Sequence, residues 1–200
     1  FSIAVRGQRK ADQPWSAQFP GLLTEGIDDP LAYVFRNIVV DCYRGMQYLI
    51  GRDEVDLSRV VTVGNDLAFI IAGLSEKITH VVCTPQLFYR TAELASATDK
   101  YPLEEINDYL RCNPEKEEKV QECLAYFDLR WIVPRVSSTT LIVCGGKDEL
   151  LNRDILRPMI RALGSRADYY ESEASGYRDG KFIHEWIASH LGFDDAILPR

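Results

Sequence analysis

The strongest chemical signal lies at residues 64–68, where a short apolar run ends and a helical pattern begins. These residues are Gly-Asn-Asp-Leu-Ala, with Asp66 at the centre. A nucleophile elbow has the same organisation, since its nucleophile sits on a strained turn between a strand and a helix, flanked by small residues. That nucleophile is usually serine. Asp66 therefore has two interpretations: it caps the next helix, or it is a carboxylate nucleophile that forms a covalent ester.

A second candidate, Asp148, stands in the turn at residues 145–149, after the apolar run 139–144. A carboxylate in this place can orient a catalytic histidine, and the order nucleophile, then acid, is that of elbow enzymes. A turn or cap aspartate ahead of the following helix is the equal alternative.

The third member, a histidine, is missing where it is needed. The segment at residues 171–180, expected to be the loop before the last helix, contains none of the three histidines. His80 opens a predicted strand, whereas His184 and His190 lie inside the last helical pattern. A lone helical histidine is more often a structural or surface residue than a catalyst, so only a relocated base such as His184 keeps a catalytic role open.

These residues stand on a regular alternation of β-branched runs and helical patterns, which predicts an α/β fold with a mostly parallel sheet covered by helices on both faces. Strands are expected at residues 3–5, 59–63, 78–83, 139–144 and 167–170, and helices at 33–50, 67–74, 152–163 and 180–191. Residues 86–134 carry three helical patterns and no strand signal, which indicates a helical insertion. The whole chain, residues 1–200, forms one domain in this interpretation.

Composition narrows the classes of partner. The net charge of −7 argues against nucleic acid and anionic membranes as partners. The five cysteines show no C-x-x-C spacing, and no histidine stands at metal-ligand spacing from them, so we expect neither a metal nor a cofactor. Unpatterned cysteines favour a reducing, cytoplasmic compartment. We find no apolar run long enough for a membrane span and no signal peptide.

Several longer segments resemble one family. They are Arg6-Gly7-Gln8 after a strand-like run, residues 26–30 (Gly-Ile-Asp-Asp-Pro) before a long helix, residues 101–111, and residues 124–128. Over almost its whole length the chain is similar to the acetylxylan esterase and cephalosporin C deacetylase family of α/β-hydrolases. The last two segments are specific, because unrelated hydrolases do not share them.

The resemblance implies a deacetylase of small esters of sugars or cephalosporins, in a family whose known members form ring-like hexamers. The family's serine would fall at Asp66 and its acid at Asp148. Its histidine would fall at Ser175, or at Tyr177 if the loop is gapped. The chain opens where the family has already supplied several strands and an oxyanion-hole residue. We therefore expect a homo-oligomer or a partner chain that supplies those strands, with a small acetyl ester as ligand.

Two hypotheses follow for the function. The first is a degenerate family member, catalytically impaired, that acts as a scaffold, regulatory or ligand-binding pseudoenzyme. The second is an active carboxylic-ester hydrolase that uses Asp66 as nucleophile or a relocated base.

Overall fold

A four-stranded parallel sheet forms the centre of the protein. The computed structural model describes residues 1–7, 16–147 and 149–193. Its strands lie side by side in chain order: β1 (Val61–Gly64), β2 (His80–Cys83), β3 (Thr139–Cys144) and β4 (Ala167–Glu171). All three neighbouring pairs are parallel. The parallel α/β architecture predicted from the sequence is confirmed.

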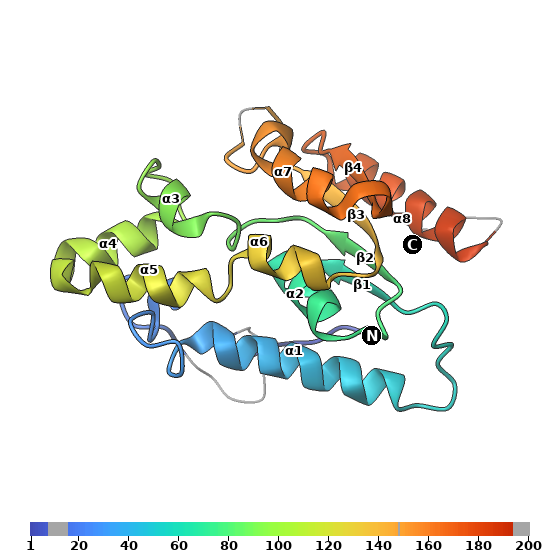
Figure 1. Ribbon diagram of the computed structural model, residues 1–200, viewed down its shortest axis with the longest axis horizontal. Coiled ribbons are helices and arrows are strands. Elements are labelled where there is room, and N and C mark those ends of the chain that lie inside the picture. Colours follow the sequence, from blue (N-terminus) through green and yellow to red (C-terminus); the bar gives the residue numbers. More distant parts are fainter. Residues whose placement is uncertain (8–15, 148, 194–200) are drawn as a thin grey trace.

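Helices connect the strands and cover the sheet (Figure 1). The α-helices are α1 (Val34–Ile50), α2 (Asp66–Leu74), α3 (Thr91–Ala95), α4 (Glu104–Cys112), α5 (Glu117–Ala125), α6 (Leu129–Ile132), α7 (Arg153–Leu163) and α8 (Gly176–Leu191). Short 3-10 helices are η1 (Leu22–Thr24), η2 (Pro114–Lys116), η3 (Val133–Arg135) and η4 (Gly164–Arg166). Within the described residues, no helix is both long and apolar enough to cross a bilayer.

The sheet separates two apolar clusters, because successive side chains of a strand point to opposite faces. Val81, Cys83 and Ile142 belong to the large cluster, on the face covered by α2 and α7, with α1 packed on α2. The other face is covered by α8, whose Trp186 packs with Val82, Leu141 and Val143. Helices on both faces thus exclude water from the central strands, while the carboxyl ends of the strands carry the elbow and its neighbours.

The segment between β2 and β3 contains only helices and connecting turns. Figure 1 shows α3, α4 and α5 gathered at the end of the molecule away from α8. α6 returns to the sheet side and packs on α2. The breaks fall where the sequence places them, since η2 begins at Pro114 and α4 follows Pro102.

The strand predicted at residues 3–5 is wrong for the described structure. Residues 1–5 form no ladder with β1, and both segments contribute to the lining of a hollow of about 390 Å³. Ile3 instead lies against Gly45 of α1. Consequently β1 is an edge strand of the described sheet, and Val63 is 57% exposed. The sequence indicates a buried strand at this position, so this detail is also corrected.

Candidate active site

Asp66 is the first residue of α2 and is almost completely buried, with 1% of its surface exposed. Both carboxylate oxygens accept backbone hydrogen bonds from the loop after β2. Gln86 N and Leu87 N each lie 3.0 Å from Oδ2, and Phe88 N lies 2.9 Å from Oδ1. Asp66 therefore binds the β2–α3 loop to the start of α2, and its lone pairs are directed at protein rather than at an open cleft.

Burial raises the pKa of Asp66 above that of an ordinary aspartate, and the backbone N–H groups of Phe88, Gln86 and Leu87 oppose that rise. The helix cap proposed for Asp66 is wrong in position. Asn65 is the N-cap residue, and its Oδ1 accepts a hydrogen bond from Leu67 N at 3.1 Å. Asp66, one residue further along, instead accepts hydrogen bonds from the β2–α3 loop.

The Asn65 cap also occupies a donor that ester hydrolysis would need. In a nucleophile elbow, the backbone N–H of the residue after the nucleophile helps to stabilise the tetrahedral oxyanion. Leu67 holds that place here, and its N–H already donates to Asn65. An incoming ester carbonyl would have to displace this side chain.

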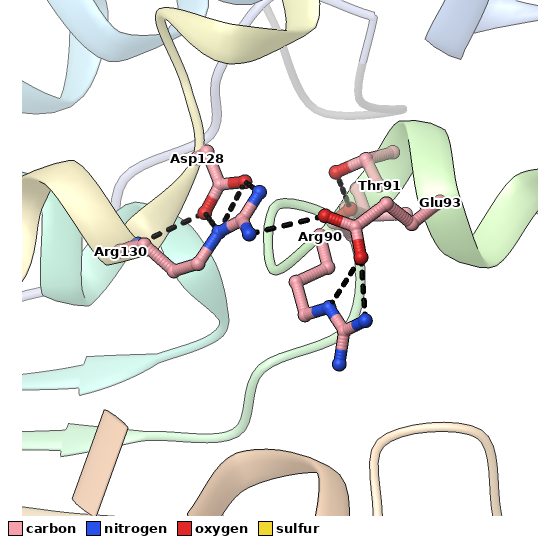
Figure 2. Close-up of polar contacts among 6 residues, drawn as sticks. Arg90, Thr91, Glu93, Asp128 and Arg130 are labelled. Atoms are coloured by element: carbon pink, nitrogen blue, oxygen red, sulfur yellow. Dashed lines mark hydrogen bonds and ion pairs between the residues drawn. The ribbon is translucent and has the colours of Figure 1, made fainter. Parts of the chain in front are cut away.

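The loop that covers Asp66 is also fixed from its other end. Leu129 N donates to Phe88 O at 2.7 Å, and Thr91 donates its hydroxyl to Leu87 O. Figure 2 shows how the next residues continue into a chain of alternating charges: Arg90 binds Glu93, Glu93 binds Arg130, and Arg130 binds Asp128.

This charge network joins α3 to α6. Asp128 caps α6 by accepting from Arg130 N at 2.9 Å, and it also receives the Arg130 guanidinium. Arg130 Nη1 lies 3.0 Å from Glu93 Oε1. With Asp66 on one side and this network on the other, the β2–α3 loop is anchored at both ends over the elbow.

The two residues at the predicted histidine position lie at the start of α8. Helix α8 begins at Gly176, four residues earlier than the predicted start at Gly180. Ser175 is its N-cap and accepts from Arg178 N, and Tyr177 lies in the first turn with 73% of its surface exposed. Asp148, the predicted acid, lies outside the described residues.

Asp179 organises the turn that leads into α8, and the early helix start follows from it. Its carboxylate accepts hydrogen bonds from Tyr170 Oη, Ser172 Oγ, and the backbone N–H groups of Glu173 and Ser175. Burial raises the pKa of Asp179, but these donors outweigh it, so the pKa lies below that of an ordinary aspartate.

We expect Asp179→Asn to destabilise the protein by about 2 kcal/mol at neutral pH, because an amide replaces an acceptor of four hydrogen bonds. A lowered folded-state pKa stabilises the fold above the unfolded pKa of about 4. That stabilisation disappears as pH falls through the folded pKa. In thermal melts from pH 7 down to pH 3, the difference in melting temperature between the two proteins should therefore be largest above about pH 4 and should begin to shrink as the pH falls below that value. A difference in melting temperature that stays constant over this range would contradict the assignment.

His184, the candidate for a relocated base, lies on α8, which covers the face of the sheet opposite to α2. Its Nδ1 is buried and has no hydrogen-bond partner in the described structure. The other two histidines contact Trp186 instead, with ring centroids 6.2 Å away for His80 and 4.1 Å for His190. Nothing in the described residues connects a histidine with Asp66.

Among those residues, no group of three or more His, Cys, Asp or Glu is placed to hold a metal ion.

Arg6, the first residue of the Arg6-Gly7-Gln8 signature, has a structural role. Arg6 Nε and Nη2 each donate to a different oxygen of Asp41 on α1, both at 2.7 Å. Gly7 has a φ of 84°, a conformation that favours glycine. Gln8 lies outside the described residues. The pair fastens the segment before β1 to α1.

Sequence reasoning missed Asn65 and Asp179, although a signal existed for each. Asn65 is a strong N-cap residue type placed directly before an apolar helical run. Ser175 followed four residues later by Asp179 resembles a capping box, lengthened by one residue.

The chain matches the acetyl xylan esterase family over residues 1–158, more than half of its length. Among solved structures, it is similar to the acetyl xylan esterase from Paenibacillus sp. R4 (24% identity, TM-score 0.75, covering 91% of this chain and 60% of that one). It is also similar to acetyl xylan esterase 1 from Thermoanaerobacterium sp. JW/SL YS485 (22% identity, TM-score 0.73, covering 92% and 64%). The chain thus spans less than two thirds of the length of either structure.

These likenesses agree with the parallel α/β fold described above. At these identities the two solved structures are evidence for the fold alone. Membership of the family rests on the match over residues 1–158. The chain belongs to the acetyl xylan esterase family of α/β-hydrolases.

Proposed function

We propose that this chain is a non-hydrolytic member of its family, a pseudoenzyme that acts as a scaffold, regulatory or ligand-binding domain. One observation carries the proposal: the residue at the nucleophile position is a buried aspartate whose two oxygens are both held by backbone N–H groups of the β2–α3 loop. To attack an ester, Asp66 would have to free one of its two oxygens, which leaves unpaired either Phe88 N–H at Oδ1 or both Gln86 N–H and Leu87 N–H at Oδ2.

Two further features support the proposal. Leu67 N–H, the first oxyanion donor of an elbow, is bound to Asn65. Ser175 and Tyr177, at the histidine position, are a helix cap and an exposed side chain, and neither provides the imidazole that serves most often as the general base. In serine hydrolases, loss of nucleophile or base costs on the order of a millionfold in turnover.

The proposal is tested by hydrolysis of p-nitrophenyl acetate. We expect the wild-type protein to release p-nitrophenol no faster than the folded variant Asp66→Asn, since neither carries a competent nucleophile. A wild-type turnover that disappears in Asp66→Asn, with the far-UV spectrum unchanged, would refute it and favour an active carboxylic-ester hydrolase that uses Asp66. A turnover lost in His184→Ala instead would favour the relocated base.

We also propose that further strands cover the β1 edge in the assembled protein, supplied by a second copy or by a partner chain. The support is the hollow between residues 1–5 and β1, which is lined mainly by apolar side chains, and the exposed Val63. An unprotected edge strand with apolar side chains is an aggregation hazard.

This chain alone should therefore form oligomers or aggregates in size-exclusion chromatography with light scattering. Val63→Lys should shift the population towards monomer, because a charged side chain on an edge strand opposes pairing. A monodisperse wild-type monomer would contradict the proposal.

A further inference from the structure

A strip of positive charge follows one side of α7. Arg153, Arg157 and Arg161 are four residues apart, so their side chains project from the same side of the helix, about 6 Å apart along its axis. All three are exposed. They line a hollow of about 350 Å³ together with Asp154, Ile160 and Tyr169 of β4. Three guanidinium groups around one hollow are a local excess of positive charge in a protein of net charge −7.

Two of the three arginines have no acidic partner in the described part of the chain. Arg157 is ion-paired with Asp154. The Arg161 side chain forms no hydrogen bond or ion pair with any described residue, and Arg153 instead stacks on the Tyr169 ring with its Cζ 4.1 Å from the ring centroid. The ring contact holds the Arg153 guanidinium beside the hollow without using its N–H groups. Both Arg153 and Arg161 can therefore donate to a ligand.

We propose that the hollow between α7 and β4 binds a small molecule carrying two or more oxyanion groups, either phosphates or carboxylates. A guanidinium presents paired N–H donors that match both groups in bidentate geometry. The spacing of Arg153 and Arg161 suits charged groups up to about 12 Å apart. The volume of the hollow lies at the lower end of the range for small-molecule sites, about 300–1,000 Å³.

This site is separate from the elbow. β2 and β3 lie between β1, which leads into Asp66, and β4, which carries Tyr169. The inference is independent of whether the elbow hydrolyses esters.

The test is isothermal titration calorimetry, in which the purified chain is titrated at low salt with inorganic tripolyphosphate and, separately, with citrate. We expect at least one of them to bind, and the double variant Arg153→Ala/Arg161→Ala to weaken that binding by about tenfold or more. The matched control is Arg52→Ala/Arg111→Ala, which removes the same charge from two exposed, ion-paired positions elsewhere. It should change the affinity by less than about twofold. Thermal melts establish that both variants are folded.

A second variant separates geometry from charge. Arg153→Lys/Arg161→Lys keeps the charge but loses the paired donors, so its affinity should fall between wild type and the alanine variant. Binding of tripolyphosphate alone identifies phosphate as the ligand group, and binding of citrate alone identifies carboxylate; either supports the site. The proposal is overturned if neither tripolyphosphate nor citrate binds at millimolar concentration. It is also overturned if the control variant loses as much affinity as Arg153→Ala/Arg161→Ala. Binding of polyglutamate with neither small anion also overturns it, in favour of an acidic polymer.

Discussion

Replacing Asp66 by alanine should lower the free energy of unfolding by about 4 kcal/mol. The substitution removes the acceptor of three backbone N–H groups, of Gln86, Leu87 and Phe88, in a site that is 1% exposed. Each buried donor left without an acceptor costs about 1–3 kcal/mol, and water entering the space vacated by the carboxylate recovers part of it. Urea denaturation followed by circular dichroism measures the change.

Asp154→Ala is the control for this experiment, because Asp154 is an exposed helical aspartate whose ion pair with Arg157 is open to solvent. Its denaturation midpoint should stay at the wild-type value. The denaturation midpoint of Asp66→Asn should lie between those of Asp66→Ala and Asp154→Ala. The amide keeps one acceptor oxygen but points its N–H groups at a backbone donor. If Asp66→Ala were as stable as Asp154→Ala, the carboxylate would not be the anchor of the β2–α3 loop.

Replacing Trp186 by alanine should cost about 3–5 kcal/mol, the usual range for removing a large buried aromatic side chain. Trp186 is the centre of the smaller apolar cluster, where it packs α8 against Val82, Leu141 and Val143. Its indole Nε1 also donates to Asp168 at 2.8 Å, so the substitution removes a hydrogen bond as well as apolar area. Denaturant titration with a far-UV signal measures the loss.

The chain offers a control of the same residue type. Trp131 on α6 is 67% exposed, whereas Trp186 is 7% exposed, so Trp131→Ala should leave the midpoint nearly unchanged. Equal effects of the two substitutions would show that α8 is not held to the sheet by Trp186.

Most of the fold was predictable from the sequence, because buried parallel strands and amphipathic helices have periodicities that differ. The strand at residues 139–144 and the helix ending at Leu163 are found where the apolar pattern predicts them. The strand predicted at residues 3–5 fails because an apolar run does not specify its pairing partner. The predicted start of α8 is misplaced because local hydrogen bonds that the side chains of Asp179 and Ser175 accept decide it, and these do not alter hydrophobic periodicity.

The candidate site was predictable only in part. The strand–turn–helix context located Asp66, since the elbow is a local feature of the sequence. Its role depends on three N–H groups about twenty residues further along, and such a contact has no local signal. Asn65 shows the opposite case, because a cap is local and its residue type and position are sufficient to predict it.

Isotope labelling of Asp66 tests the central claim most directly. A carboxylate nucleophile would displace p-nitrophenolate from p-nitrophenyl acetate and form a mixed anhydride with the acetyl group. Water that attacks the aspartyl carbonyl of this anhydride releases acetate, so turnover in H₂¹⁸O by this route would place ¹⁸O in the Asp66 side chain. The protein is incubated with excess p-nitrophenyl acetate in H₂¹⁸O, digested, and the peptide that contains Asp66 is analysed by mass spectrometry. We predict no ¹⁸O in that peptide beyond the level of a sample without ester. Incorporation at Asp66 that grows with incubation time would contradict a structural carboxylate and establish an active nucleophile.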